Sequence, residues 1–195
     1  MLTLVWDVDD VLNDLMHQWF HCQWMTDHPE CRLRFEDLNS NPPHAALGVS
    51  REEYLSSMDL FRQTNRAKEM QPNPEVLAWF SKHGARFRHA ALTARPLATA
   101  PDVASWVFKH FGFWIRTFGV VPSRHDADTP LYDLTKGEYL RWLRGGDLLI
   151  DDSSENISQA AGLGMRVLQP AQPWNNSELT MQALLHQLAT MPENR

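Results

Sequence analysis

The chain has 195 residues, of which 43% are hydrophobic and 22% are charged, and its formal net charge is −6. This length suits one domain, or one domain with a modest insertion, and the hydrophobic content allows a sizeable core. The acidity and the lack of a Lys/Arg tract disfavour a nucleic-acid polymer as partner, and no apolar run approaches membrane-spanning length. Neither a secretion signal nor a disulfide framework is indicated, so we expect a soluble cytoplasmic protein; the oligomeric state is left open.

The first predicted strand covers residues 2–7 and ends at Asp7, with Asp9 two positions later. Side chains alternate along a strand, so these two carboxylates are expected to point the same way. Apolar residues then repeat at helical spacing from Leu12 to Phe20, which predicts an amphipathic helix running into the mid-twenties.

Residues 27–71 differ in character, because they show no strand-like alternation and contain the loop signal of residues 39–43. Ser50 and Glu53 fit a capping box that opens a helix through about Met58, and residues 59–70 can hold a second short helix. We interpret 27–71 as a small helical insertion lying over a main domain formed by 1–26 and 72–195.

After residue 72 the chain alternates between helix and strand. Asn73 and Pro74 predict the start of a helix that runs to His83, with Gly84 as its C-cap. The later expected elements are a strand over 87–92, a helix ending near 112, a strand over 114–121, a helix over 134–143, a strand over 147–150, a helix with Ile157, Ala160 and Ala161 facing inward, a strand over 165–168, and a closing helix with the stripe Met181, Leu184, Leu185 and Leu188. This order predicts an α/β fold with a Rossmann-like parallel sheet of about five strands and helices on both faces.

Polar residues follow three of the predicted strands directly, and they are Asp7, Asp9, Thr93, Asp151 and Asp152. Ligands of parallel α/β sheets bind beyond the carboxyl ends of the strands. Four carboxylates at one edge would repel each other strongly, and hard oxygen ligands suit Mg²⁺. Thr93 and a basic residue would complete an anion site. Lys136 is favoured because it opens a helix, and Arg124, beyond the third strand, is the alternative.

These segments resemble the four motifs of the haloacid dehalogenase (HAD) superfamily. The matching stretches, in chain order, are Asp7-Val-Asp9-Asp10-Val-Leu, Ala90-Ala-Leu-Thr93, Lys136, and Leu148-Leu-Ile-Asp151-Asp152. Residues 148–156 and 172–175 are also similar to the 5'-deoxyribonucleotidase group. The resemblance implies that 27–71 is a helical cap, which would exclude water and select the substrate.

The resemblance further implies roles for single residues. Asp7 would be the nucleophile that forms an aspartyl-phosphate, and Asp9 would be the general acid and base. Mg²⁺ would be held by Asp7, the backbone carbonyl of Asp9 and Asp152, with Asp151 behind them or bound through water. Thr93 and Lys136 would hold the phosphoryl oxygens. Such an enzyme is a Mg²⁺-dependent phosphomonoesterase for a small phosphorylated metabolite, with (deoxy)nucleoside monophosphates as first candidates and a 5'-nucleotidase as the specific form. A phosphotransferase or mutase, or a non-catalytic phosphate-binding module, remains an alternative.

For several other residues, a purely structural role has to be weighed against a functional one. The set His17, His21, Cys22, His28 and Cys31 has two histidines one helical turn apart, which suits zinc, but a His-rich region without metal is favoured. Trp19, Phe20 and Trp24 either stack on a nucleobase or belong to the core, and the core is favoured for Trp19 and Phe20.

Arg95 either contacts the substrate or pairs with a surface acid, and the pairing is favoured. Asp10 is expected to be solvated or a cap, and Asn13 to support the turn after the first strand.

Overall fold

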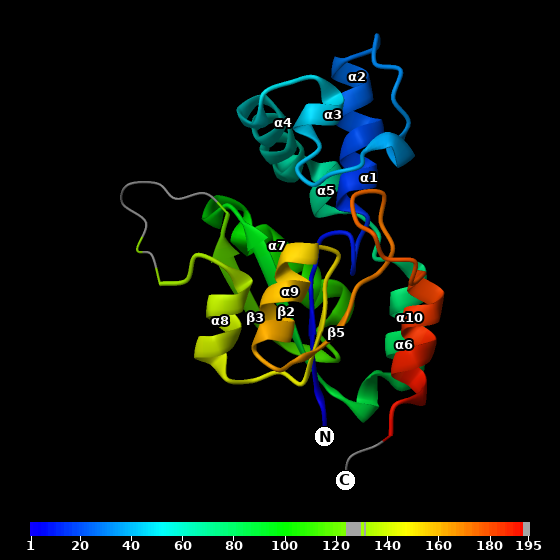
Figure 1. Ribbon diagram of the computed structural model, residues 1–195, viewed down its shortest axis with the longest axis vertical. Coiled ribbons are helices and arrows are strands. Elements are labelled where there is room, and N and C mark those ends of the chain that lie inside the picture. Colours follow the sequence, from blue (N-terminus) through cyan, green and yellow to red (C-terminus); the bar gives the residue numbers. More distant parts are fainter. Residues whose placement is uncertain (124–129, 131, 193–195) are drawn as a thin grey trace.

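A computed structural model describes residues 1–123, 130 and 132–192. Its centre is one sheet of five parallel strands in the order β3-β2-β1-β4-β5 (Figure 1). The strands are β1 (Thr3–Trp6), β2 (Arg88–Arg95), β3 (Ile115–Pro122), β4 (Leu148–Ile150) and β5 (Arg166–Leu168). The predicted α/β class and parallel sheet are therefore confirmed.

Strand β1 is central because its short apolar run is buried on both faces. Val5 pairs with Ala90 of β2 on one side and with Leu149 of β4 on the other. All pairings are parallel, so the carboxyl ends of β1, β2 and β4 lie at the same edge of the sheet. The backbone N–H of Asp7 donates to the Ile150 carbonyl at 2.8 Å, which ties the exits of β1 and β4 together.

Helices cover both faces of the sheet. Leu4 and Trp6 of β1 pack into one cluster with residues of α6 (Pro74–His83), α7 (Ala100–Phe111) and α10 (Met181–Thr190). Val5 points to the opposite face, where its cluster includes residues of α8 (Lys136–Leu143) and α9 (Ser154–Gly162). This alternation of side chains along β1 is what the strand geometry requires.

Most of the predicted helix ends agree with the structure. Asn73 caps α6 by accepting from the N–H groups of Glu75 and Val76, and the closing helix α10 buries Leu184, Leu185 and Leu188. Gly84 follows α6 as expected, but with a right-handed φ of −57° that continues into a 3₁₀ turn (Gly84–Arg86). Glycine is needed there for space, because a Cβ atom would lie 2.8 Å from Cδ1 of Trp114.

Two expectations about individual side chains are wrong. Ala161 is exposed, while Ala160 is buried, because neighbouring residues on a helix point about 100° apart. Thr93 lies inside β2 and not beyond it, because β2 continues to Arg95 along the full length of β3. The side chain of Thr93 is nevertheless buried and lines a cavity at the carboxyl edge of the sheet.

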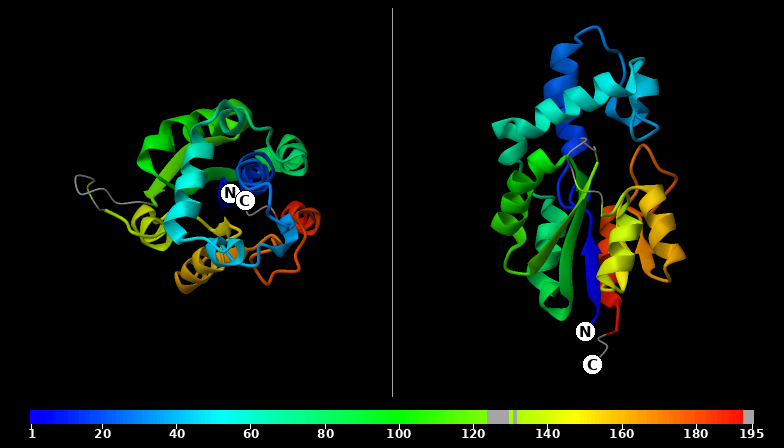
Figure 2. Two further views of the ribbon diagram at one scale, coloured as in Figure 1. Left: turned by 90° about the horizontal axis from the view of Figure 1, so that it is seen from above. Right: turned by 90° about the vertical axis from the view of Figure 1, so that its left-hand side faces the viewer.

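A helical unit stands beyond the carboxyl ends of the strands (Figures 1 and 2). It contains α1 (Leu15–Trp19), a π-helical turn (Phe20–Trp24), α2 (Met25–Asp27), a 3₁₀ turn (Phe35–Asp37), α3 (His44–Leu47), α4 (Arg51–Gln63) and α5 (Asn65–Lys68). Ser50 caps α4 by accepting from the Glu53 N–H at 3.1 Å, as predicted, and α4 runs beyond Met58. Of the described helices, none is long and apolar enough to cross a membrane.

The helical unit has a hydrophobic cluster of its own. Its buried members are Leu15, Met16, Trp19, Phe20, Trp24, Leu38, Tyr54, Met58, Phe61, Ala67 and Met70. The helix that begins at Leu15 thus packs with residues 38–70 rather than against the sheet. Residues 15–24, which the predicted boundary at 27 assigns to the main domain, therefore share the hydrophobic cluster of the helical unit.

His89 in β2 is a buried histidine that is held neutral between the indole of Trp6 and the backbone carbonyl of Gly84. Its Nδ1 accepts from Trp6 Nε1 at 3.0 Å, so Nε2 carries the proton and donates to the Gly84 carbonyl at 2.8 Å. Burial lowers the pKa of His89 to about 4, although the hydrogen bond to Gly84 opposes this. The unfolded chain binds this proton near pH 6.5 and the folded chain does not, so stability must fall as the pH drops from 6.5 to 4.

We therefore expect the contribution of His89 to the free energy of unfolding to fall by up to about 3 kcal/mol between pH 6.5 and 4. Urea unfolding across this range should show a smaller acid loss for His89→Gln than for the wild type, and the difference isolates His89 from the buried carboxylates. The same change at the exposed His186 is the control. Identical pH slopes for the wild type and His89→Gln would contradict the assignment.

Candidate active site

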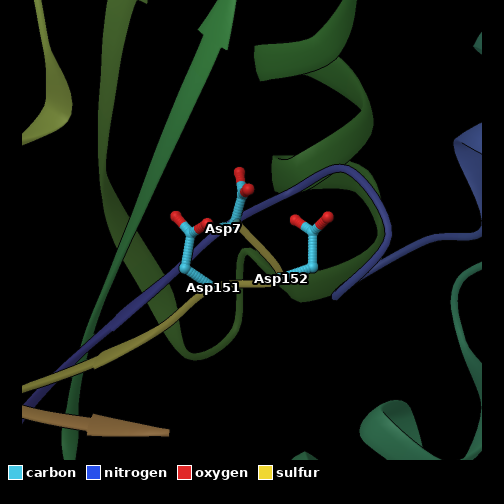
Figure 3. A group of neighbouring side chains, drawn as sticks. All are labelled: Asp7, Asp151 and Asp152. Atoms are coloured by element: carbon cyan, nitrogen blue, oxygen red, sulfur yellow. The ribbon is translucent and has the colours of Figure 1, made fainter. Parts of the chain in front are cut away.

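Three buried carboxylates meet at the carboxyl edge of the sheet (Figure 3). Asp7 follows β1, and Asp151 and Asp152 follow the neighbouring strand β4. One oxygen atom from each lies within 4.8 Å of the others. The sequence places these residues 144 positions apart, and the parallel pairing of β1 with β4 brings them together, as predicted.

The Asp7 carboxylate has one bonded oxygen and one open oxygen. Oδ1 accepts from the Val8 N–H at 2.7 Å and lies 2.7 Å from Nζ of Lys136. Oδ2 has no hydrogen-bond partner within the described parts of the chain. Burial raises the pKa of Asp7 well above its usual value and the charge of Asp151 adds to this, whereas Lys136 opposes both. Asp7 is thus an oriented carboxylate whose charge is incompletely balanced.

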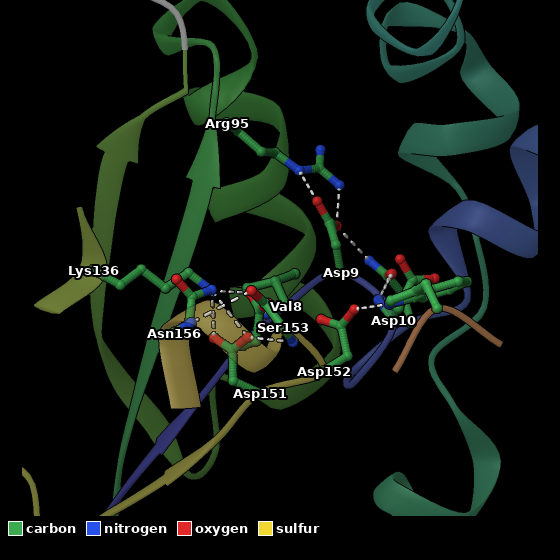
Figure 4. A network of polar contacts seen from close by, with 12 residues as sticks. Val8, Asp9, Asp10, Arg95, Lys136, Asp151, Asp152, Ser153 and Asn156 are labelled. Carbon is green, nitrogen blue, oxygen red and sulfur yellow. Dashed lines mark hydrogen bonds and ion pairs between the residues drawn. The ribbon is translucent and has the colours of Figure 1, made fainter. Parts of the chain in front are cut away.

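Asp151 is saturated by hydrogen bonds (Figure 4). Its oxygens accept from Lys136 Nζ at 2.8 Å, the Ser153 N–H at 2.9 Å and Asn156 Nδ2 at 3.0 Å. With these partners in place, Asp151 fits the predicted supporting position behind a metal better than a direct ligand role. Sequence reasoning missed Ser153 and Asn156, although Ser153 stands where the N-cap of α9 had to be.

Asp152 is held by the loop that follows β5. Residues 172–175 of this loop stand out in the sequence only for their similarity to the 5'-deoxyribonucleotidase group. Trp174 Nε1 donates to Oδ2 of Asp152 at 2.6 Å, and the side chains of Asn175 and Gln169 each donate to its carbonyl at 2.8 Å. The Trp174 ring also packs edge-on against Phe35 of the helical unit, with centroids 5.9 Å apart. This loop therefore connects the acidic cluster to the helices above it.

The acidic cluster fits a divalent cation. Burial raises the pKa of Asp152 well above its usual value, and the charges of Asp151 and Asp10 raise it further, while the Trp174 hydrogen bond and Lys136 oppose them. Among the described residues, Lys136 is the cation in direct contact with the cluster, through Asp7 and Asp151. A hard cation between Asp7 and Asp152 would supply the missing positive charge with the oxygen ligands that Mg²⁺ prefers.

The alternative zinc set does not assemble. His17, His21, Cys22, His28 and Cys31 are all described, and no three of them come close enough to share an ion. His28 instead stacks on Trp24 with centroids 3.8 Å apart. Trp24 belongs to the buried cluster of the helical unit, as do Trp19 and Phe20, so all three are core residues.

Asp9 is held by arginines from two sides. Arg95 Nε donates to Oδ2 at 2.7 Å, and a second Arg95 nitrogen contacts Oδ1 (Figure 4). Arg62 of α4 lies 3.7 Å from the same carboxylate, and Asn13 Nδ2 donates to it at 3.4 Å. Burial would raise the pKa of Asp9, but the charges and hydrogen bonds of Arg95, with Arg62 and Asn13, lower it. The expectation that Arg95 pairs with a surface acid is wrong, because Arg95 is buried and its partner is Asp9.

Thr93 and Lys136 both reach the site. The Thr93 hydroxyl is buried and has no hydrogen-bond partner among the described residues. Lys136 opens α8 as predicted, and its buried Nζ bridges Asp7 and Asp151. Burial would lower the pKa of Lys136, but Asp151 and Asp7 raise it above its usual value, so the ammonium stays charged. The alternative cation, Arg124, lies outside the described residues.

The turn between Asp7 and α1 is built by two side chains. Asp10 has a left-handed φ of 61° and its Oδ1 accepts from the Met16 N–H at 2.8 Å. Oδ1 of Asn13 accepts from the N–H groups of Asp10 and Leu15. Asp10 is therefore a buried cap rather than a solvated residue, and Asn13 supports the turn as expected.

A cavity of about 240 Å³ opens above Asp7. From the core side it is lined by the acids together with Thr93, Lys136, Ser153 and Asn156. From the other side it is lined by Leu15, Met16, Asn41, Pro42 and one face of α4. The open oxygen of Asp7, a free hydroxyl and a charged lysine thus converge on a space that suits a small oxyanion ester.

Comparison with known proteins identifies the fold. No family model and no curated protein matches the sequence. Among solved structures, a HAD-like hydrolase from Streptococcus pneumoniae shares 14% identity with a TM-score of 0.59, over 96% of this chain and 91% of that one. A candidate β-phosphoglucomutase from Thermotoga maritima shares 13% identity with a TM-score of 0.52, over 96% and 98%. YfnB from Bacillus subtilis, a candidate HAD hydrolase bound to magnesium, shares 15% with a TM-score of 0.53, over 96% and 98%.

At these identities the likeness concerns the fold. The five-stranded parallel sheet with helices on both faces is the fold of these HAD-superfamily neighbours. The finer resemblance to the 5'-deoxyribonucleotidase group is not confirmed by them.

Proposed function

We propose that the protein is a Mg²⁺-dependent HAD-type phosphatase that hydrolyses a small phosphorylated metabolite through an aspartyl-phosphate on Asp7. The observation that carries this proposal is the Asp7 carboxylate, which has one open oxygen at a cavity and lies in contact with Lys136 and within an acidic cluster. The fold of magnesium-bound YfnB supports the choice of ion.

Each residue of the site has a defined role in the proposed hydrolysis. Asp7 attacks phosphorus as the bond to the leaving oxygen breaks, and Asp9 gives that oxygen a proton. Asp9 then takes a proton from the water that attacks the aspartyl-phosphate, which releases phosphate and restores Asp7. Thr93 and Lys136 hold the phosphoryl oxygens. Mg²⁺, held by Asp7, the Asp9 carbonyl and Asp152, would offset the charge that develops there.

The ion pairs of Asp9 set a condition on this scheme. With Arg95 and Arg62 beside it, Asp9 is ionised and ready to act as a base, but it carries no proton for the leaving group. Proton donation therefore requires that a bound ligand draw at least one arginine away from Asp9. Since Arg62 belongs to the helical unit, this exchange would couple the position of that unit, acting as a cap, to the chemistry.

Hydrolysis of 4-nitrophenyl phosphate tests the proposal. Purified protein should release phosphate with Mg²⁺ and stop when the ion is removed by EDTA, and added Mg²⁺ should restore turnover. A lack of Mg²⁺-dependent phosphate release from any member of a phosphometabolite panel, (deoxy)nucleoside monophosphates included, would overturn it.

The fold of the β-phosphoglucomutase neighbour favours a phosphotransferase or mutase as the second candidate. Both reactions share the phosphorylated Asp7, and they differ in the acceptor that takes the phosphoryl group. Transfer to an added alcohol in competition with water would support the second candidate over the first.

Thr93→Val should separate activity from stability. No residue that the structure describes bonds to the buried hydroxyl, so its replacement by a methyl group of similar size should leave the free energy of unfolding unchanged or raise it by about 1 kcal/mol. The lost hydrogen bond to the phosphoryl group should lower kcat/KM about 10–100-fold. Urea unfolding and steady-state kinetics measure the two effects, and full activity in the variant would contradict the role of Thr93.

A further inference from the structure

One face of α4 forms a wall of the cavity. The residues of α4 that line it follow helical spacing and are Arg51, Tyr54, Leu55, Met58 and Arg62. The middle of this stripe is apolar, and each end carries an arginine. A ligand that lies along α4 therefore meets a positive charge, then an apolar surface, then a second positive charge.

The arginine near Asp7 is already engaged. Arg62 contacts Asp9 at 3.7 Å and Asp59 at 3.0 Å, although its buried Nε–H has no partner in the part of the chain that the structure describes. Arg62 thus serves the end of the cavity where the phosphoryl group is transferred.

The arginine at the far end is not engaged. The Arg51 guanidinium has no ion pair or hydrogen bond with any residue in the described ranges, and Arg51 is an exposed residue that lines the cavity. It also occupies the first turn of α4, where the helix dipole favours acids and disfavours a cation. Neither pairing nor helix stability accounts for an arginine at this position.

The two arginines cannot serve one phosphate. They are eleven positions apart, which is an axial rise of about 16 Å between their Cα atoms along α4. This rise exceeds the size of a phosphoryl group, and Arg62 is held at its own end by Asp9 and Asp59, so the two guanidinium groups face different parts of a ligand. The apolar residues between them, Tyr54, Leu55 and Met58, would cover the part that joins those ends.

We infer that the substrate is a phosphomonoester whose leaving group has an apolar body and a second anionic group, which Arg51 binds. This inference rests on the proposed phosphatase function and assigns specificity to α4. Arg51 binds the distal anion, the apolar stripe covers the body, and the phosphoryl group lies at Asp7. A neutral leaving group of the same size uses the same cavity without the contact to Arg51.

A matched pair of esters tests the inference. Phenyl phosphate and 4-carboxyphenyl phosphate differ by one carboxylate on the side of the ring away from phosphorus. The wild type should prefer the carboxylated ester about 10–100-fold in kcat/KM, the range of one charged hydrogen-bonded contact. Arg51→Gln should bring this ratio close to one, and Arg51→Lys should keep part of it.

Arg32→Gln is the matched control, because it removes the same charge from an exposed position of the helical unit that does not line the cavity. It should keep the wild-type ratio. A ratio near one in the wild type, or a ratio that Arg51→Gln leaves unchanged, overturns the inference.

Failure of the phosphatase proposal would look different, since neither ester would then be hydrolysed. Binding of phenylphosphonate and 4-carboxyphenylphosphonate, measured by calorimetry with Mg²⁺ present, decides the role of Arg51 in that case. Tighter binding of the carboxylated phosphonate that is lost in Arg51→Gln supports the inference, and equal binding of the two compounds overturns it.

Discussion

Asp7→Asn should abolish phosphatase activity, with kcat lowered by roughly 10⁴-fold or more, because an amide cannot form the aspartyl-phosphate. The fold should persist, since the amide has nearly the size of the carboxyl and its oxygen can still accept from the Val8 N–H. Steady-state kinetics with an aryl phosphate and thermal unfolding together measure both expectations. The exposed Asp14, which does not line the cavity, provides the matched control as Asp14→Asn and should retain activity.

Loss of activity in Asp7→Asn has to be separated from loss of the metal, because Asp7 is also a proposed ligand. Mg²⁺ titration distinguishes the two causes, since a variant that only binds the ion more weakly recovers turnover at high Mg²⁺. A missing nucleophile is not restored by any concentration. Intact-mass measurement after an acid quench should also show a phosphorylated species in the wild type and none in Asp7→Asn. Turnover by Asp7→Asn at saturating Mg²⁺ would remove Asp7 as the nucleophile.

Lys136→Met should destabilise the protein by about 3–5 kcal/mol, because it removes the buried cation from two buried carboxylates. Nζ lies 2.7 Å from Asp7 and 2.8 Å from Asp151, and the lysine is only 2% exposed. Urea unfolding without metal gives this number directly. The exposed Lys82 on α6 is the control, and Lys82→Met should change stability by less than about 0.5 kcal/mol.

A double-mutant cycle identifies the cause of that loss. If Lys136 stabilises the fold by balancing charge, then Asp151→Asn should cost less in the Lys136→Met background than in the wild type. The expected coupling energy lies between about 0.5 and 3 kcal/mol. Strictly additive effects would show that packing of the lysine stem, and not its charge, accounts for the destabilisation.

Added Mg²⁺ should stabilise Lys136→Met more than it stabilises the wild type, because the repulsion among the acids is no longer reduced by the lysine and the ion has more of it to relieve. This connection explains why one lysine can matter to both folding and catalysis. The charge that holds Asp7 and Asp151 together in the free protein is the charge that would contact the phosphoryl group in the complex.

Much of the site follows from local sequence patterns. The alternation of apolar strands with amphipathic helices requires a parallel sheet, and a parallel sheet places all its strand ends at one edge. Asp7, Asp151 and Asp152 could therefore be assigned to one place from two short motifs, one after each of two strands. Lys136 could likewise be assigned to a helix start from the pattern over 134–143, and the structure shows Thr135 as the cap of that helix.

The sequence by itself thus determined the fold class, the edge of the sheet that carries the acids, and the residues that meet there. Only the tertiary structure decided which partners those residues take. Arg95 reaches Asp9 across 86 positions, Trp174 reaches Asp152 across 22, and α1 joins the helical unit rather than the sheet. The periodicity of a helix or strand repeats within a short segment, so it can be recognised from that segment alone. A side-chain ion pair or hydrogen bond depends on how distant segments pack against each other, and the sequence of one segment does not contain this information.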